Sequence, residues 1–176
     1  MAFLGSRLPR SSLYLGKLAT ITLLSMTSIM LGTVALLTGI KYVLNIPVKG
    51  IIFIMAASIS QLGAMPLLAF HLWVGFARGM GASIGLGGAG VLIASLMATS
   101  LGNTVWPLVP WAWPVRLSML PGIYLPGVKL PPPLESSGFF LNQSLKGIIP
   151  AAVFFTIMLL GGLMWFERWE GRKVYD

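Results

Sequence analysis

The sequence contains no cysteine and few charged side chains. Four Asp and Glu residues stand against twelve Lys and Arg, and only 9% of the 176 residues are charged, whereas 56% are hydrophobic. The absence of cysteine excludes a disulfide framework, a thiolate metal site and a cysteine nucleophile. A soluble domain normally has about 25% charged residues. A water-exposed surface cannot be built from so few charges, so we predict that most of the chain lies in lipid.

Acidic side chains are missing from every long apolar stretch. All four acids lie outside these stretches: Glu135, Glu167, Glu170 and Asp176. Ion-coupled pumps and intramembrane hydrolases generally need buried ionisable groups, and the sequence has no H-E-x-x-H, G-x-S-x-G or P-loop motif. His71 is the only histidine, and a metal site needs several ligands, so a boundary position is favoured over a metal or proton-relay role. We expect no catalytic, cofactor-binding or metal-binding residues and no ATP hydrolysis by this chain alone.

The net charge of +8 raises the alternative of a nucleic-acid partner. The cations form no basic stripe, which argues against that partner. They sit singly or in pairs between the apolar stretches, and we interpret them as topology determinants and as contacts to anionic headgroups. With the N-terminus inside, the inner segments carry more Lys and Arg than the outer ones. The positive-inside rule then predicts a multi-pass membrane protein with both termini in the cytoplasm.

Four stretches without any Asp, Glu, Lys or Arg are long enough to span a bilayer. A hydrocarbon core of about 30 Å needs about 20 helical residues. Backbone groups in lipid must bond internally, which at this length means helices. We predict one transmembrane domain over residues 1–176, an all-α bundle of about four spanning helices. The predicted spans are residues 18–40, 50–70, 79–101 and 147–166, followed by a cytoplasmic tail, 167–176.

The first stretch also has the basic leader of a secretory signal peptide. Its apolar run is far longer than the roughly 7–15 residues of a signal h-region. No Ala-x-Ala cleavage site follows it closely. A retained span is therefore favoured over cleavage.

Residues 102–146 differ from the other connections because they are rich in proline. Eight of the twelve prolines lie between Pro107 and Pro133, and such density forbids a long continuous helix. We predict an outer loop that lies partly across the outer face, with short interfacial helices. Four residues of this loop are expected to lie at the membrane–water boundary: Trp106, Trp111, Trp113 and Arg116. The alternative is that they contact the cargo.

Small and polar residues within the spans predict helix packing. Gly81 and Gly85 form a G-x-x-x-G pattern that Ala89 continues, and small residues four apart let two helices approach closely. We consider three roles for this pattern, in decreasing order of preference: packing inside one subunit, a seam with a second chain, and a flexible ligand-lining helix. Gln61 is costly to bury and is expected to face another helix rather than a substrate.

The N-terminal segment carries the first family signal. The stretch Leu8-Pro-Arg-Ser-Ser-Leu-Tyr-Leu-Gly-Lys17 resembles the SP-x-S/R-R-x-x-L-Y-x-x-K stretch of permease subunits from type-two ATP-binding-cassette exporters. In that family the stretch forms the cytoplasmic coupling region that contacts the ATPase and leads into the third membrane helix. The resemblance implies that residues 1–17 are a coupling segment with ATPase contacts at Arg7, Arg10, Ser11, Tyr14 and Lys17. On the residues alone, the segment is equally an interfacial anchor on anionic lipid.

A second set of motifs is similar to the lantibiotic-immunity branch of that family. It consists of His71-Leu-Trp-Val-Gly-Phe-Ala-Arg78, then Ala82-Ser-Ile-Gly-Leu-Gly87, then Trp106-Pro-Leu-Val-Pro-Trp-Ala-Trp-Pro-Val-Arg116. The order and spacing agree over nearly the whole chain. Family members have six membrane helices, whereas the apolar stretches here correspond to the last four. We expect the first two to be missing because the gene is split or truncated, its start is misplaced, or a shorter form works with another permease.

The resemblance implies a mechanism and its partners. These would be a separate ATP-binding-cassette ATPase, which holds ATP and magnesium, and a second permease subunit, in a bacterial plasma membrane. Closure of the ATPase would push on the coupling segment. The implied substrate is an amphipathic antimicrobial peptide, a bacteriocin of the lantibiotic class, exported for self-immunity. The alternatives are a non-transporting membrane scaffold or immunity protein acting through helix–helix contacts and, less favoured, a membrane-embedded enzyme.

Overall fold

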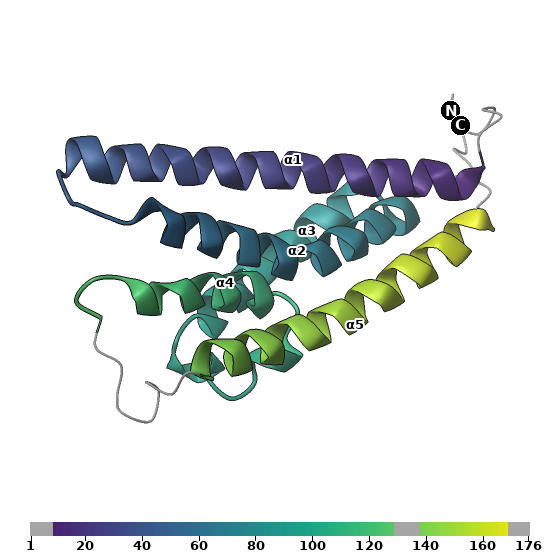
Figure 1. The fold of residues 1–176 in the computed structure, drawn as a ribbon. Coiled ribbons are helices and arrows are strands. Elements are labelled where there is room, and N and C mark those ends of the chain that lie inside the picture. Colours follow the sequence, from purple (N-terminus) through teal and green to yellow (C-terminus); the bar gives the residue numbers. More distant parts are fainter. Residues whose placement is uncertain (1–8, 129–137, 169–176) are drawn as a thin grey trace.

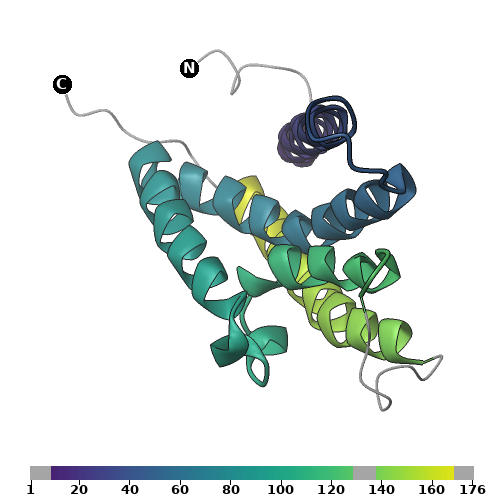
Figure 2. The same ribbon diagram turned by 90° about the vertical axis from the view of Figure 1, so that its left-hand side faces the viewer.

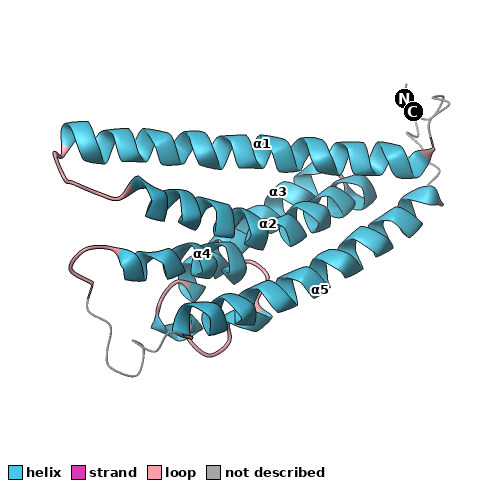
Figure 3. Ribbon diagram, in the orientation of Figure 1, coloured by secondary structure: helices cyan, strands magenta, loops and turns pink. Residues whose placement is uncertain are grey.

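The computed structural model describes residues 9–128 and 138–168, and the regular elements in these two ranges are all helical (Figure 3). The long helices are α1 (Arg10–Thr38), α2 (Gly50–Arg78), α3 (Met80–Met97) and α5 (Phe139–Glu167), and the shorter α4 is Ala112–Met119. A π turn and three 3₁₀ turns accompany them: η1 (Gly39–Val43), η2 (Ser100–Gly102), η3 (Trp106–Leu108) and η4 (Leu120–Tyr124). Arg7 and most of the predicted cytoplasmic tail lie outside the described residues.

Four helices of the described chain are long and apolar enough to cross a membrane, judged by length and composition. They are Arg10–Val43, Gly50–Arg78, Met80–Met97 and Phe139–Glu167. This finding confirms the predicted all-α class with about four spanning helices. It also supports a multi-pass membrane protein.

Three of the four long helices extend beyond the uncharged stretches of the sequence, whereas α3 ends at Met97, before residue 101. α1 begins at Arg10 rather than at residue 18, α2 continues to Arg78 rather than ending at residue 70, and α5 begins at Phe139 rather than at residue 147. Charged side chains near helix ends can reach the headgroups by snorkelling, so a charge need not end a helix. The 29 residues of α5 are roughly 43 Å long at 1.5 Å per residue. That helix can therefore reach both headgroup layers.

α2 lies at the centre of the bundle and packs against α1, α3, α4 and α5 (Figures 1 and 2). Its buried positions include the small residues Ala57, Gly63 and Ala69. A Cβ on Gly63 would lie 2.9 Å from the backbone nitrogen of Pro114, so the start of α4 rests directly on the α2 backbone. Lipid provides no hydrophobic force between helices, and close contacts of this kind hold them together instead.

The connection between α3 and α5 folds back against the other helices. α4 contacts both α2 and α5, and α5 begins within the predicted loop at Phe139. A Cβ on Gly147 would lie 2.7 Å from Cζ3 of Trp106, so the indole packs directly against the α5 backbone. The buried cluster around this contact consists of Trp106, Ala112, Trp113, Leu117 and Ala151.

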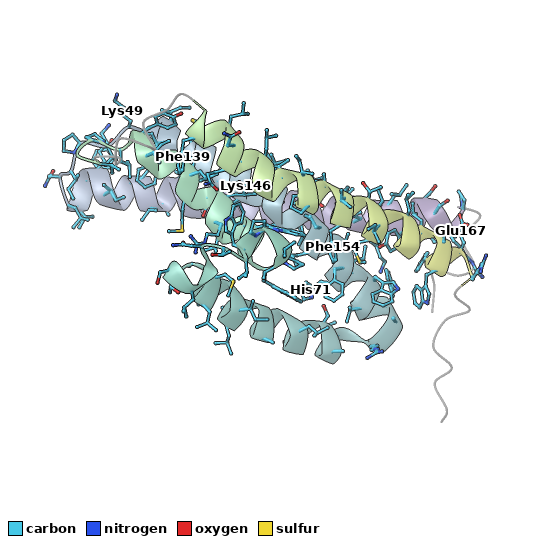
Figure 4. All side chains as sticks on the ribbon, turned by 90° about the horizontal axis from the view of Figure 1, so that it is seen from below. Lys49, His71, Phe139, Lys146, Phe154 and Glu167 are labelled. Carbon is cyan, nitrogen blue, oxygen red and sulfur yellow. The ribbon has the colours of Figure 1, made fainter. Side chains whose placement is uncertain are left out.

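The first residue of α1 and the last residue of α5 lie at the same end of the protein. Arg10 Nη1 donates a hydrogen bond to the backbone oxygen of Glu167 at 3.0 Å. Figure 4 shows Lys49 and Phe139 at the opposite end from Glu167. An even number of crossings produces this arrangement.

Because the chain lacks cysteine, single cysteines can report its topology. Lys49→Cys, just before α2, and Thr104→Cys, in the turn after α3, should react with a membrane-impermeant maleimide in intact cells. Arg168→Cys, just after α5, should react only after permeabilisation, because it lies at the other end of the bundle. The measurement is a gel shift after labelling, with the cysteine-free chain as control. Labelling of Arg168→Cys in intact cells would contradict the predicted orientation, with both termini in the cytoplasm.

Candidate functional site

We call Arg10, Ser11, Tyr14 and Lys17, at the start of α1, the basic end. Arg10 bonds to the last backbone carbonyl of α5, and cations near a helix C-terminus interact favourably with its exposed carbonyls. Lys17 Nζ lies 5.1 Å from the ring centroid of Phe76, a cation–π distance. The basic end is therefore attached to the last turns of both α2 and α5.

Tyr14 is the most enclosed side chain of the basic end. It is fully buried, and its ring centroid lies 5.6 Å from that of Phe166 and 6.4 Å from that of Phe76. A Cβ on Gly162 would overlap the Tyr14 hydroxyl, so glycine is needed there to admit the ring. The hydroxyl has no hydrogen-bond partner within the described chain, so packing holds the side chain. A partner at this end would meet the neighbouring α1 side chains rather than the tyrosine.

Sequence reasoning did not single out the residues that enclose Tyr14. Gly162 and Phe166 are four positions apart on α5 and share a helix face, which is the one signal that the sequence offers. That spacing does not say which helix meets this face. Phe76 belongs to another helix, so its place in the cluster depends on the tertiary structure.

A groove lies between α1 and α3 with α2 as its floor, and we call it the α1–α3 groove. Its volume is about 530 Å³. In its wall, His71 Nδ1 lies 3.2 Å from Ser83 Oγ, and that hydroxyl donates to the His71 backbone oxygen at 3.2 Å (Figure 4 labels His71). Lys17 lines one end. The apolar lining consists of Ile21, Leu68, Leu72, Phe76 and Met80.

Arg116 binds the C-terminal end of α3. Its guanidinium donates to the backbone oxygens of Met97 and Thr99, and Nη1 donates to Asn103 Oδ1 at 3.0 Å. The last carbonyls of a helix have no partner within the helix, and the planar guanidinium can serve several acceptors at once. Arg116 therefore fixes the path of the chain as it leaves α3.

The three tryptophans of the α3–α5 connection have different surroundings. Trp106 and Trp113 are only 5% and 2% exposed. Trp111 packs against Gly90 of α3, and its ring centroid lies 6.0 Å from that of Phe70. The sequence suggested rings at the membrane–water boundary. The structure gives two of them a protein environment and uses the third to attach the connection to α3.

Gln61 links α1 and α2. Its side chain is 6% exposed, and Ser25 Oγ donates to its Oε1 at 3.0 Å. Its Nε2 donates to the backbone oxygen of Thr22 at 3.5 Å. Polar side chains within membrane helices bond across helices in this way, so the structure accounts for Gln61 without a substrate.

Gly81 and Gly85 lie on an open face of α3. A Cβ at either position would meet no atom within 4 Å, and Ala89 is also exposed. The one buried residue of α3 is Gly90, which meets Trp111. Packing inside this chain therefore does not explain Gly81 and Gly85 in the part that the structure describes. A seam with a second chain and a ligand-lining face remain as the interpretations.

The basic end and the α1–α3 groove offer cations and apolar surface to a partner. No three metal-ligating side chains come together within residues 9–128 and 138–168. His71 and Ser83 are in contact, but none of the described residues that line their groove is acidic.

Gly162→Ala should lower the free energy of unfolding by about 1–3 kcal/mol, the usual cost of overpacking, because its Cβ would displace Tyr14. Gly161→Ala is the matched control, since its Cβ meets no atom within 4 Å and alanine favours helix over glycine. The measurement is denaturation of the purified chain in mild detergent, followed by circular dichroism. Equal effects of the two changes would contradict the packing of Tyr14 against Gly162.

Arg116→Lys should destabilise the chain by about 1.5–3 kcal/mol, the range for hydrogen bonds to charged groups. A lysine keeps the charge but cannot replace the planar fork of donors. Arg78→Lys, at an exposed helix end, is the control and should change little. The same denaturation experiment measures both variants, and wild-type stability of Arg116→Lys would refute the capping role.

The chain matches no family model, no curated protein and no solved structure. The assignment supported so far is therefore a polytopic membrane protein with four candidate spans in the described part of the chain.

Proposed function

We propose that this chain is the membrane-spanning permease subunit of an ATP-driven exporter. Its substrate would be an amphipathic antimicrobial peptide of the lantibiotic class, removed from a bacterial plasma membrane for self-protection. The proposal combines the family resemblance of the N-terminal and tryptophan-rich motifs with the way in which α1 is attached to the bundle. ATP and magnesium would be held by a separate ATPase, and this chain would contribute no cofactor site.

The continuity of α1 is the observation that carries the proposal. Residues of the basic end and the apolar residues that follow belong to one uninterrupted helix from Arg10 to Thr38. A push on the basic end would therefore move the whole helix as a rod. Because Tyr14 packs against Phe76 and Phe166, the same push would reach the ends of α2 and α5.

Packing along the rest of α1 leaves room for such movement. The helix contacts mainly α2 and α5, and apolar side chains along it remain exposed, with Leu23 at 65% and Leu31 at 66%. Coupling to ATP would require the ATPase to bind two states of the permease with different affinities. A second permease subunit could occupy the open face of α3 at Gly81 and Gly85, since small residues favour close helix approach.

The second candidate function is a non-transporting membrane scaffold or immunity protein. The open glycine face of α3 favours it, because that face could bind a partner helix without any transport. The two functions differ in their need for an ATPase. A scaffold would protect cells in the absence of ATP hydrolysis.

Charge reversal at the basic end tests the permease function. If a neighbouring reading frame encodes a P-loop ATPase, the chain is co-expressed with that ATPase and purified by a tag on the chain. Arg7→Glu/Arg10→Glu should reduce co-purification and ATPase stimulation at least about tenfold, because two contacts of the coupling segment become repulsive. Lys41→Glu/Lys49→Glu, at the opposite end of the bundle, is the matched control and should behave as wild type.

Survival of cells exposed to a lantibiotic gives the second readout. Under the permease function, protection should be lost both in the Arg7→Glu/Arg10→Glu variant and with an ATPase whose P-loop lysine is replaced. Unchanged ATPase association in the variant would count against the coupling role. Protection that persists with the inactive ATPase would favour the scaffold.

A further inference from the structure

The α1–α3 groove changes its chemical character along its length. At the basic end it carries the cation of Lys17, held over the ring of Phe76. His71, paired with Ser83, lies five residues earlier on α2, about 7.5 Å along the helix axis from Phe76. Further from the basic end, the lining is apolar at Leu68 and Ile21. From the end of the bundle inward, the groove therefore has a cation beside the apolar Phe76 and Met80, then the polar His71–Ser83 pair beside Leu72, and then an apolar lining without polar groups.

This order matches the parts of a phospholipid: an anionic phosphate, the glycerol esters and an acyl chain. We propose that the α1–α3 groove binds one anionic phospholipid, with its phosphate at Lys17 and an acyl chain between α1 and α3. The volume of 530 Å³ lies within the range of about 300–1,000 Å³ that ligand pockets have. Basic pockets between membrane helices bind anionic headgroups by charge complementarity.

The charges around the groove favour a lipid over a cationic peptide. Among the described residues that line the groove none is acidic, so they offer no counter-ion to a peptide cation. Arg78 adds a second cation near the rim of the groove. It is exposed, and it lies seven residues after His71 and three after Gly75, which places the three residues on one face of α2. Both cations attract an anionic headgroup and repel a basic peptide.

The bound lipid would join two helices that are held apart by α2. α1 and α3 each pack against α2 and lie on different sides of it (Figure 2). An acyl chain between them would fill the groove and resist movement of α1 toward α3. This inference goes beyond the exporter function and does not depend on it, because it needs no ATPase.

Filling the groove from its floor is the first test. Gly75 lines the groove next to Phe76, and a Cβ there would meet no atom within 4 Å, so Gly75→Leu would fill the headgroup end of the groove, between Lys17 and His71, without a clash at Cβ. Leucine also favours helix over glycine, so the variant should fold. Gly32→Leu, at an exposed position of α1 with the same open surroundings, is the matched control.

Native mass spectrometry of the purified full chain in detergent measures the binding. Wild type and Gly32→Leu should each retain one phosphatidylglycerol in preference to phosphatidylcholine with the same acyl chains. Gly75→Leu should lose the retained lipid. Lys17→Gln should weaken phosphatidylglycerol binding about fivefold, the effect of one cation near an anionic surface, whereas Lys49→Gln should have no effect.

Two competitors show whether the groove recognises a whole phospholipid, a free phosphate or a cationic peptide. Glycerol phosphate should not displace phosphatidylglycerol, because it lacks the acyl chain. A synthetic cationic amphipathic peptide should bind wild type and Gly75→Leu equally. Three outcomes would each overturn the proposal. They are equal retention of the two lipids by wild type, full retention of phosphatidylglycerol by Gly75→Leu, and a Gly75→Leu variant that loses only peptide binding.

Discussion

Close contacts at a few glycines hold the helices of this protein together. Lipid is as apolar as the side chains, so helices gain little from burying apolar surface against one another and associate through close packing. Gly63 admits the start of α4 onto α2, Gly90 admits Trp111 against α3, and Gly162 admits Tyr14 against α5. In each case a backbone or an aromatic ring occupies the space where a side chain would otherwise stand. The positions of these missing side chains therefore decide how the helices are arranged.

The few cations of the described chain act near helix ends. Arg10 binds a carbonyl at the end of α5, Arg116 binds carbonyls at the end of α3, and Lys17 lies over the Phe76 ring near the end of α2. Helix ends expose carbonyl groups that have no partner within the helix, and cations are favourable there. Residues that the sequence predicts to orient the chain in the membrane thus also connect its helices.

The combination of a firmly packed end and a loosely packed length gives α1 its proposed role. At the basic end, Tyr14 is enclosed by rings from two other helices. Along most of its length, α1 meets few neighbours and presents apolar side chains to its surroundings. Under the proposed function, a helix with this packing would carry a displacement from the ATPase into the membrane. The α1–α3 groove beside it is where a lipid would oppose that displacement.

The sequence by itself determined the lipid environment of most of the chain, its helical class and the approximate number of membrane spans. These follow from the scarcity of charge and from the need to satisfy backbone groups in lipid, which depend on composition and length alone. The tertiary structure decided which glycines are covered: Gly90 and Gly162 meet aromatic rings, whereas Gly81 and Gly161 meet nothing. It also buried Trp106 and Trp113 in a connection that reads as an outer loop. No local pattern could decide these points, because a glycine or an indole acquires its partner only when helices distant in sequence come together.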